Sequence, residues 1–326
     1  MTRTIPLQKV RDAAKAIYDP VVRTPLVRLD VPEAWRTRVP SAPERLYLKL
    51  ETLQPIGSFK IRGAQNAVRQ LDRATLDGGV WTVSAGNAAQ GVALAARAAG
   101  AHCSVMVMDT APAAKIRAIE ALGATIVRAT YDECWRTVES RRSDRMTGYF
   151  VHPFDDDEFI AGNATIALEI LDEIPQPDAI VAAIGGGGLL SGLGVVVPEL
   201  SPSTRLFAAE PATAAPLATS LSAGTPSAFP GWTASFVDGA GGKSVLPSMF
   251  PLLQRTVTES IVVSLEEVAD AMTLVAERLH VIAEGAGACA VAAALTGRAG
   301  SGTVVAIVSG GNIDLAKFAT LTHAFA

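Results

Sequence analysis

The sequence predicts an α/β protein with two three-layer domains, each built on a mostly parallel, twisted sheet. Short apolar runs of strand type alternate with helical patterns along the whole chain, and this alternation is typical of parallel sheets covered by helices. Several of these runs end in loops of glycine and small polar residues. The chain has 326 residues, which favours two domains over one.

The elements follow one another in a regular order. Strands are expected at 46–51, 80–87, 103–108, 125–129, 150–154, 178–184, 205–211, 260–264 and 303–311. Helices are expected at 60–71, 88–100, 112–124, 131–142 and 158–174, and after 185–188, 260–264 and 303–311. The stretch 211–231 is low in charge and rich in Pro, Ser and Ala, so it is expected to be a surface loop or irregular segment.

Composition excludes several classes of protein. Hydrophobic residues make up 49% of the chain and charged residues 18%, which is enough for a core and argues against disorder. The net charge of -4 gives no indication of nucleic-acid binding. Three scattered cysteines argue against a disulfide framework and a structural zinc site.

The sequence also argues against export and membrane insertion. The first 18 residues contain no apolar segment of signal-peptide type. The uncharged run 179–197 is long enough to raise the question of a membrane span, but four glycines interrupt it. We therefore expect a cytoplasmic protein with no membrane partner.

Lys60 occupies an unusual place in the stretch QPIGSFKIRG, residues 54–63. Ser58 predicts the N-cap of a helix in which Lys60 leads the apolar stripe. Burial and the helix N-terminus would both favour the neutral, nucleophilic amine. The alternative is a surface lysine at the start of a helix. The expected stripe is Gly63, Ala64, Ala67, Val68 and Leu71, and the expected solvated face is Arg62, Gln65, Asn66, Arg69 and Gln70.

Four consecutive glycines, residues 185–188, lie between an expected strand and a helix. Such a loop can turn backbone N–H groups toward a phosphate at a helix N-terminus. A tight turn without a ligand is the alternative. The dinucleotide fingerprint fails because Leu190 and Ser191 occupy the places for its third glycine. The GGKS at 241–244 lacks the first glycine of a nucleotide-triphosphate loop.

Two further strand ends carry polar groups. SAGNAAQG, residues 84–91, offers Ser84, Asn87 and backbone amides at a helix start, which suits a substrate carboxylate. A plain turn with Asn87 as N-cap is the alternative. SGGN, residues 309–312, offers a hydroxyl at a strand end, and a plain turn is again possible.

Together and in order, these motifs resemble the serine/threonine dehydratase family of pyridoxal-phosphate enzymes, which has the tryptophan-synthase-like fold called fold type II. The resemblance covers nearly the whole chain and is specific because many motifs occur in sequence. They are RTPL at 24–27, GSFKIRGA at 57–64, SAGNAAQG at 84–91, VHPFDD at 151–156, the glycines at 185–188, EGAGA at 284–288 and SGGN at 309–312.

The resemblance implies a role for each of these positions. Lys60 would hold pyridoxal 5'-phosphate as a Schiff base, and Lys60 and Ser84 would be catalytic. The implied cofactor-binding residues are Phe59 against the ring, Asn87 on its phenolic oxygen, Gly185, Gly186, Gly187, Gly188 and Leu189 on the phosphate, Glu284, and Ser309 on the ring nitrogen. The implied substrate loop is Ser84, Ala85, Gly86, Asn87 and Ala88.

The implied reaction is α,β-elimination of water from a β-hydroxy amino acid of the threonine or serine type. Lys60 would remove the Cα proton, and the products would be a 2-oxo acid and ammonia. β-Replacement, racemisation and a non-catalytic role in binding pyridoxal phosphate or an amino acid are the alternatives.

The chain departs from the family pattern at several positions. Ala88 stands where histidine is usual, which suggests a roomier or differently shaped pocket. Ala85 replaces a serine of the family's racemases, which disfavours racemisation. Glu210 matches one ligand of the family's cation site and Ala214 its backbone carbonyl, but Pro216 stands where a second carboxylate is expected. We therefore expect no metal, with Glu210 as a weak candidate.

The resemblance also predicts an organisation. A large cofactor-binding domain would comprise 1–71 and 153–326, and a small inserted domain 72–152 would carry the substrate loop and could close over substrate. No C-terminal regulatory domain is expected, and a homodimer is implied.

Overall fold

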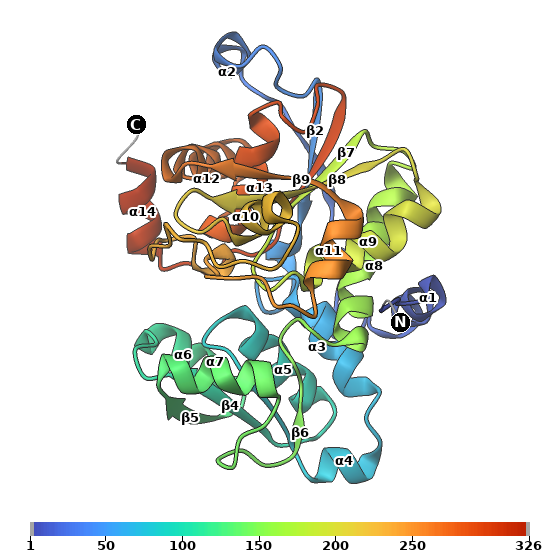
Figure 1. Ribbon diagram of the computed structural model, residues 1–326, viewed down its shortest axis with the longest axis vertical. Helices are drawn as coiled ribbons and strands as arrows, with labels where there is room; N and C mark the ends of the chain where they lie inside the picture. Colours follow the sequence, from blue (N-terminus) through green and yellow to red (C-terminus); the bar gives the residue numbers. More distant parts are fainter. Residues whose placement is uncertain (1–2, 324–326) are drawn as a thin grey trace.

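The computed structural model describes residues 3–323, which form two sheets with helices on both faces (Figure 1). The larger sheet has six strands in the order β1-β2-β10-β7-β8-β9, and the smaller has four in the order β5-β4-β3-β6. Only β1 and β2 pair in antiparallel fashion among the pairings of these strands. The predicted α/β class with mostly parallel sheets is confirmed.

The elements have the following bounds. The strands are β1 Leu26–Leu29, β2 Arg45–Leu50, β3 Val80–Val83, β4 Cys103–Met108, β5 Thr125–Ala129, β6 Tyr149–Phe150, β7 Ala179–Ala183, β8 Arg205–Pro211, β9 Val257–Val263 and β10 Thr303–Val308. The helices are α1 Leu7–Ala16, α2 Glu33–Arg38, α3 Lys60–Arg69, α4 Arg73–Asp77, α5 Asn87–Ala98, α6 Ala113–Glu120, α7 Tyr131–Ser140, α8 Asp157–Glu173, α9 Gly188–Leu200, α10 Pro216–Ala223, α11 Phe250–Thr256, α12 Leu265–Leu279, α13 Gly285–Leu295 and α14 Leu315–His323, with the short 3₁₀ turns η1 Glu51–Leu53 and η2 Asp238–Ala240.

The smaller sheet comes from one continuous part of the chain. Its strands all lie between Val80 and Phe150, inside the region expected to form the inserted domain. The domain boundaries at 72 and 152 stay a prediction. The strand expected at 150–154 is shorter than predicted, because pairing with β3 ends at Val151 and Pro153 has no N–H to donate.

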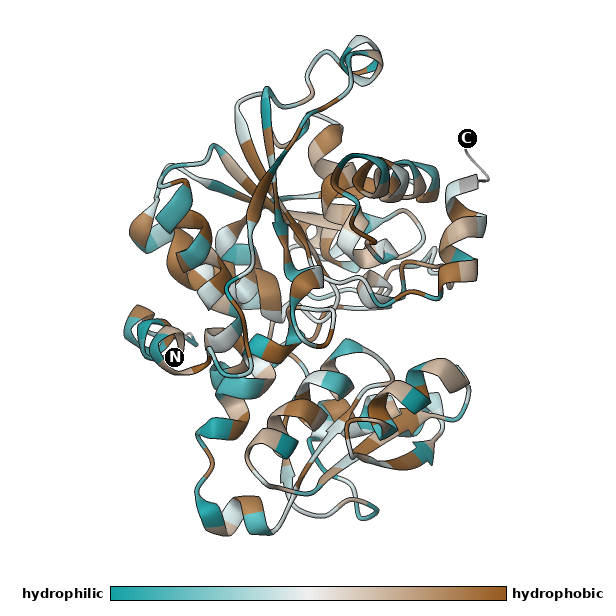
Figure 2. Ribbon diagram, turned by 180° about the vertical axis from the view of Figure 1, so that it is seen from behind, coloured by the Kyte–Doolittle hydropathy of each residue, from teal (hydrophilic) through white to brown (hydrophobic). Residues whose placement is uncertain are grey.

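The larger sheet is buried on both faces. Alternate residues of β10 point to opposite sides: Val305 and Ile307 belong to the apolar cluster that contains α8 and α9, and Val304 and Ala306 to the cluster that contains α12 and α13. Figure 2 shows the apolar colour concentrated along these strands, while the outer surfaces of the covering helices are more polar. The carboxyl ends of the five parallel strands, β2, β10, β7, β8 and β9, lie on the side that faces the smaller sheet (Figure 1).

Helix α3 differs from its predicted one-sided pattern. Arg62 and Asn66, expected on a solvated face, are fully buried, while Leu71, expected in the buried stripe, is only half-buried and lies beyond the helix end. The reason is that α3 contacts both α5 and α8. A methyl group on Gly63 would lie 2.6 Å from the carbonyl oxygen of Phe159 on α8, so the two helices approach very closely.

Ser58 is not the N-cap that the sequence predicted. The cap position of α3 belongs to Phe59, whose side chain makes no capping hydrogen bond, although the Ser58 hydroxyl accepts a long hydrogen bond of 3.4 Å from the N–H of Lys60. Ser58 instead forms a β-bridge with Gly310, and the N–H of Phe59 donates to the carbonyl oxygen of Ser309 at 3.1 Å. The segment before Lys60 is therefore held mainly by backbone contacts with the SGGN loop.

The stretch 211–231 was expected to be irregular, but it contains helix α10. The helix begins at Pro216, and proline is favoured in a first turn because no N–H is needed there. Its next two N–H groups, those of Leu217 and Ala218, donate to the carboxylate of Glu210 at 2.8 Å each. The stabilising acceptor comes from β8, outside the helical segment, so local composition did not reveal it.

The uncharged run 179–197 forms β7, a glycine loop and most of α9. Within residues 3–323 there is no helix with the length and apolar character needed to cross a membrane.

Candidate active site

A cavity of about 670 Å³ lies at the carboxyl ends of β3, β7 and β10. Ligands of open α/β sheets bind at such strand ends. All the cofactor and substrate residues predicted from the sequence line this one cavity: Phe59, Lys60, Ser84, Ala85, Gly86, Asn87, Ala88, Gly185, Gly186, Gly187, Gly188, Leu189, Glu284 and Ser309. Glu210 does not belong to its lining.

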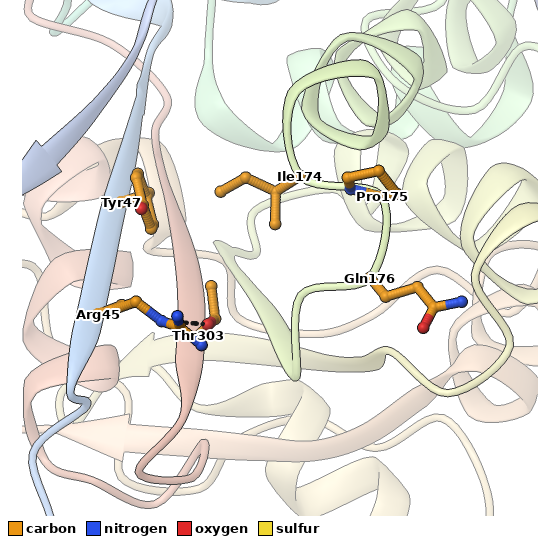
Figure 3. Close-up of a pocket in the computed structure, with 6 residues that line it drawn as sticks. All are labelled: Arg45, Tyr47, Ile174, Pro175, Gln176 and Thr303. Atoms are coloured by element: carbon orange, nitrogen blue, oxygen red, sulfur yellow. Dashed lines mark hydrogen bonds between the residues drawn. The ribbon is translucent and has the colours of Figure 1, made fainter.

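A second pocket, of about 370 Å³, lies at the opposite end of the larger sheet (Figure 3). It is lined by the first residues of β2 and β10, where Nε of Arg45 donates to Oγ1 of Thr303 at 2.9 Å. It contains none of the predicted site residues.

Lys60 is the first residue of α3, and its amine lies among aromatic rings. Nζ is 5.3 Å from the ring centre of Phe59, 6.0 Å from that of Phe154 and 5.5 Å from that of Phe159. It donates a hydrogen bond of 2.7 Å to the carbonyl oxygen of Pro153. Burial lowers the pKa of Lys60 to about 8, because a charged amine loses hydration there. The neutral, nucleophilic form is therefore accessible near physiological pH.

The glycine loop turns from β7 into α9 under close packing. Gly187 has a φ of +90°, a conformation that glycine adopts without strain. A side chain on Gly186 would overlap the ring of Phe154, and one on Gly188 would lie 2.8 Å from the carbonyl oxygen of Phe154. The first N–H groups of α9 have no acceptor within the helix. The loop is therefore a narrow backbone cradle of the kind that binds a phosphate.

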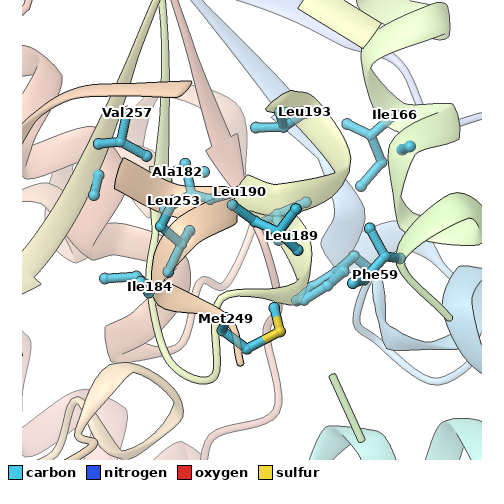
Figure 4. Close-up of a cluster of buried hydrophobic side chains, with 14 of the residues drawn as sticks. Phe59, Ile166, Ala182, Ile184, Leu189, Leu190, Leu193, Met249, Leu253 and Val257 are labelled. Atoms are coloured by element: carbon cyan, nitrogen blue, oxygen red, sulfur yellow. The ribbon is translucent and has the colours of Figure 1, made fainter. Parts of the chain in front are cut away.

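An apolar cluster packs against the first residues of α9, directly after the glycine cradle. Figure 4 shows Leu189 and Leu190 of α9 near Met249 and Leu253, with Leu193 further along the helix toward Ile166. Phe59, the neighbour of Lys60, belongs to the same cluster. The cradle and the lysine thus share one rigid support.

Asn87 connects two loops instead of capping its own helix. The cap position of α5 belongs to Gly86 and has no side-chain hydrogen bond. The amide of Asn87 donates to Oε1 of Glu284 at 2.7 Å, and its oxygen accepts from the amide of Asn312 at 2.8 Å. Asn312 lies in the SGGN motif but was not predicted as a site residue. These hydrogen bonds join the loop after β3, the connection between α12 and α13, and the loop after β10 at the cavity.

Glu284 is a buried acid in the cavity wall. Burial, with a smaller contribution from the charge of Asp238, raises its pKa to about 7. The carboxyl group can therefore hold or release a proton close to neutral pH.

The loop from Ser84 to Ala88 brings β3 into α5 at the cavity. The Ser84 hydroxyl accepts a hydrogen bond of 3.1 Å from the N–H of Gly86. Backbone N–H groups of the first turn of α5 face the same loop. This is the arrangement expected for binding a carboxylate.

His152 is a buried residue that the sequence analysis did not assign, although it lies in the VHPFDD motif. Its Nδ1 accepts hydrogen bonds from the N–H groups of Asp155 and Phe154, at 2.8 and 3.3 Å. Burial lowers the pKa of His152 to about 3, so the ring is neutral. It thereby shapes the turn that presents the Pro153 carbonyl to Lys60 and the Phe154 ring to the glycine loop.

Glu210 is fully engaged within the protein. Besides the two N–H groups of α10, it accepts a hydrogen bond of 2.5 Å from the hydroxyl of Ser260. Burial raises its pKa. Between residues 3 and 323 no group of three His, Cys, Asp or Glu side chains is placed to hold a metal ion. These contacts do not fit the cation site suggested by the resemblance.

Comparison with known proteins decides the family. The family described as pyridoxal-phosphate dependent enzyme matches residues 17–310 of the chain. The chain belongs to this family. The match spans the helix of Lys60, the glycine cradle and the strand β10, so it includes every wall of the cavity.

Individual members of the pyridoxal-phosphate-dependent enzymes resemble the chain over almost its whole length. It is 37% identical over 314 residues to an L-threonine ammonia-lyase of Thermotoga maritima, which covers 95% of this chain and 76% of the relative. It is 34% identical over 331 residues to a serine racemase of Dictyostelium discoideum, covering 98% of each. The structure of maize serine racemase is similar with a TM-score of 0.88 at 32% identity, covering 99% of this chain and 98% of that one.

The site of this pyridoxal-phosphate-dependent enzyme fits its cofactor. Side chains at 185–188 would collide with neighbouring residues such as Phe154, so only glycines allow the backbone N–H groups of this loop to take the close-packed turn at the start of α9. A desolvated lysine lies in the wall of the same cavity. A phosphate-bearing aldehyde needs both of these features, and the structure brings them together from segments far apart in the sequence.

Proposed function

We propose that the protein is a dehydratase, or ammonia-lyase, that eliminates water from a β-hydroxy α-amino acid and releases a 2-oxo acid and ammonia. The observation that carries this proposal is the buried Lys60 amine, in the wall of the cavity that also contains the glycine cradle and the carboxylate-binding loop. The similarity to the L-threonine ammonia-lyase supports it.

Each part of the cavity would hold one part of the cofactor. Lys60 would attach it as a Schiff base, and the cradle with Leu189 would bind its phosphate. Phe59 would lie against the ring, Ser309 would face the ring nitrogen, and Asn87 would face the phenolic oxygen. When bound, the cofactor supplies an electron sink for the negative charge that develops at the substrate Cα.

The chain's own residues would orient the substrate and move its proton. The Ser84–Ala88 loop would bind the α-carboxylate through backbone N–H groups and the Ser84 hydroxyl. This fixes the Cα–H bond relative to Lys60, whose neutral Nζ accepts the proton. The β-hydroxyl would then leave with its bonding electrons and take up one proton to become water, which balances the proton that Lys60 removed from Cα. The released enamine would tautomerise to an imine and react with water to give the 2-oxo acid and ammonia.

Racemisation is the second candidate, because serine racemases are among the similar proteins. A racemase needs a second proton-transfer group on the face of Cα opposite the lysine. The resemblance assigned that role to a serine hydroxyl, and this chain has Ala85 at the position. A methyl group cannot transfer a proton, so we propose elimination as the main activity. The homodimer and the cytoplasmic location stay predictions from the sequence.

The test is 2-oxo acid release by the purified, cofactor-loaded protein from a panel of β-hydroxy amino acids, with the configuration at Cα of the remaining substrate followed in parallel. Release is expected, and Lys60→Ala should abolish it. Lys15→Ala, which changes a lysine exposed on α1, is the matched control.

Inversion at Cα without release would favour racemisation, and consumption of substrate only with added sulfide would favour β-replacement. No turnover with bound cofactor would favour a binding role.

A further inference from the structure

One wall of the cavity has a composition that the proposed chemistry does not explain. This wall, called here the small-sheet wall, comes from β3, β4 and α7. It consists of Val83, Met106, Met108, Cys134, Trp135 and Val138. All six residues belong to one apolar cluster or pack directly against it.

The small-sheet wall continues directly from the carboxylate-binding loop. Val83 and Met106 are partners in the β3–β4 register, so their side chains lie on the same face of the sheet. The N–H of Ser84 donates to the carbonyl oxygen of Met106 at 3.1 Å. Met108 is two residues further along β4 and points to the same face. A substrate held at Ser84 therefore has these side chains as its neighbours.

Helix α7 completes the wall. Cys134 and Val138 are four residues apart and lie on the same side of the helix. Both are nearly inaccessible, and Trp135 between them is partly buried against the same cluster. Burial raises the pKa of the Cys134 thiol to about 11, so the wall carries no charge at neutral pH.

The cavity offers no spare cation to a polar substituent. Among the described residues that line it, the cationic side chains are Lys60 and Lys115. Lys60 serves the chemistry, and Lys115 forms an ion pair with Asp238. A second carboxylate on the substrate would therefore be buried without a partner, which is costly.

The space beside the carboxylate loop is also open to a large group. Ala88 lines the cavity with a methyl group, where the family pattern has a histidine ring. The volume of about 670 Å³ is that of the cavity as a whole, which would hold the cofactor together with the substrate.

We propose that the natural substrate carries a large apolar substituent of aromatic size on its β-carbon, and that the small-sheet wall binds it. Methionine sulfur and the Trp135 indole both make favourable contacts with aromatic rings. This inference rests on the proposed function, since it places the substrate through the carboxylate loop and Lys60.

The first test compares kcat/KM for 2-oxo acid release from serine, threonine, β-phenylserine and β-hydroxyaspartate, in both Cβ configurations. Phenylserine should exceed serine by at least about tenfold, because burial of a phenyl group contributes to binding, and hydroxyaspartate should give no release. If serine or hydroxyaspartate is the best substrate, the inference is overturned while the proposed function stands.

A variant of Trp135 tests whether the substrate preference depends on the small-sheet wall. Trp135→Ala should lower the ratio of kcat/KM for phenylserine over serine several-fold. Arg136→Ala, which changes the next and exposed residue of α7, should leave the ratio as it is. Because both substrates are measured on one preparation, partial unfolding of a variant does not change the ratio. An unchanged ratio in Trp135→Ala would show that the wall does not bind the substituent.

A binding measurement separates the two proposals. Phenylalanine and alanine have no β-hydroxyl to lose, so their binding to the cofactor-loaded protein can be followed by its visible absorption without turnover. Phenylalanine should bind at least about tenfold more tightly. Absence of release from every hydroxy amino acid would reject the proposed function, and equal binding of the two probes would independently reject the apolar wall.

Discussion

Burial sets the protonation of three ionisable side chains around the cavity. It lowers the pKa of Lys60 to about 8 and that of His152 to about 3, and it raises that of Glu284 to about 7. In each case the neutral form gains, because charged groups lose more hydration than neutral ones. Such shifts are common where side chains must exchange protons.

Glu284 makes the stability of the cofactor-free protein depend on pH. Its pKa rises from the ordinary 4.5 to about 7 on folding, so the folded state binds the proton more tightly. This contribution is complete below pH 4.5 and is lost as the pH rises through 7, with a total of about 3 kcal/mol. Glu284→Gln should remove this part of the pH dependence. The measurement is urea unfolding of both proteins at several pH values between 4.5 and 8.

One control variant and one contrary outcome test this prediction. Glu266→Gln changes a glutamate in the first turn of α12 and should leave the pH profile unchanged. Parallel profiles for the wild type and Glu284→Gln would show that Glu284 is not protonated in the folded protein.

Single residues were predictable where a motif demanded a small or reactive side chain. Local pattern singled out Lys60, Ser309 and the four glycines but left a surface lysine and plain turns open, and the family resemblance supplied their roles. The structure places all of them in the wall of one cavity, and the roles stay predictions. The Pro153 carbonyl was not found, because a backbone acceptor has no signature of its own. Its position depends on His152 and the turn that His152 holds.

At the scale of helices and strands, a buried network of ion pairs holds helix α3 in place. Arg62 donates to Glu51 at 2.8 Å and to Glu169 at 2.6 Å, and Lys49 pairs with Glu169 at 2.6 Å. Tyr18 adds a hydrogen bond to Glu169 at 2.6 Å. The network joins α3 to η1 and α8, two residues beyond Lys60. The sequence pattern missed it because a helical wheel assumes one buried side, whereas α3 is covered on two.

Removing Arg62 should be strongly destabilising. Arg62→Met leaves two buried carboxylates with one cation, and breaking a buried pair in this way costs about 3–5 kcal/mol. Arg73→Met breaks an exposed pair with Asp77 and should cost less than about 1 kcal/mol. Chemical denaturation of both variants tests this. If Arg62→Met and Arg73→Met unfolded at the same denaturant concentration, the buried network would add nothing to stability.

Helix α10 makes a metal unnecessary at Glu210. Both carboxylate oxygens are already bonded, to the N–H groups of the helix and to Ser260. We expect a chelator to leave both 2-oxo acid release and the melting temperature unchanged, and added Mg²⁺ or Ca²⁺ to have no effect. Glu210→Gln should lower the free energy of unfolding by about 1–3 kcal/mol, because the glutamine amide has only one oxygen that can accept hydrogen bonds. A fall in melting temperature on chelation of the wild type would contradict this assignment.

At the scale of the whole molecule, two contacts at the entrance of the cavity connect the part of the chain that forms the smaller sheet with the part that forms the larger sheet. Lys115 of α6 pairs with Asp238 of η2. Nζ of Lys243 lies 4.5 Å from the ring centre of Tyr131 on α7 and 4.4 Å from that of Trp232. Four of the five residues in these contacts, Lys115, Asp238, Tyr131 and Trp232, also line the cavity. The contacts between the two sheets therefore involve side chains that a bound substrate would meet.

Weakening the contact of Lys243 with Tyr131 and Trp232 should weaken substrate binding at the cavity entrance without impairing the chemical step. Lys243→Met removes the charge but keeps the length, and an exposed cation–π contact contributes about 0.5–1 kcal/mol. We expect KM to rise two- to fivefold, a change of about that energy, with little change in kcat. Lys317→Met on α14 is the exposed control. Unaltered KM in Lys243→Met would show that this contact does not contribute to closure.

The whole arrangement was predictable only in part. Alternation of strands and helices indicated parallel sheets and placed the polar loops at one edge. It did not give the strand order, the antiparallel β1 or the helix α10, because these depend on contacts between distant segments. The cavity was implied correctly because carboxyl ends of parallel strands meet wherever the order places them.

The position of β10 has a consequence for the way the protein is made. This strand lies between β2 and β7, yet it leaves the ribosome long after both. The nascent chain must therefore carry two apolar strands with open edges, which are prone to pair with other chains. The smaller sheet, whose strands are consecutive in the chain, can fold meanwhile as a unit. The segment that carries Lys60 acquires its support from Ser309 only after β10 has been translated. A ribosome that stalls before β10 therefore releases a chain in which this reactive lysine is unsupported.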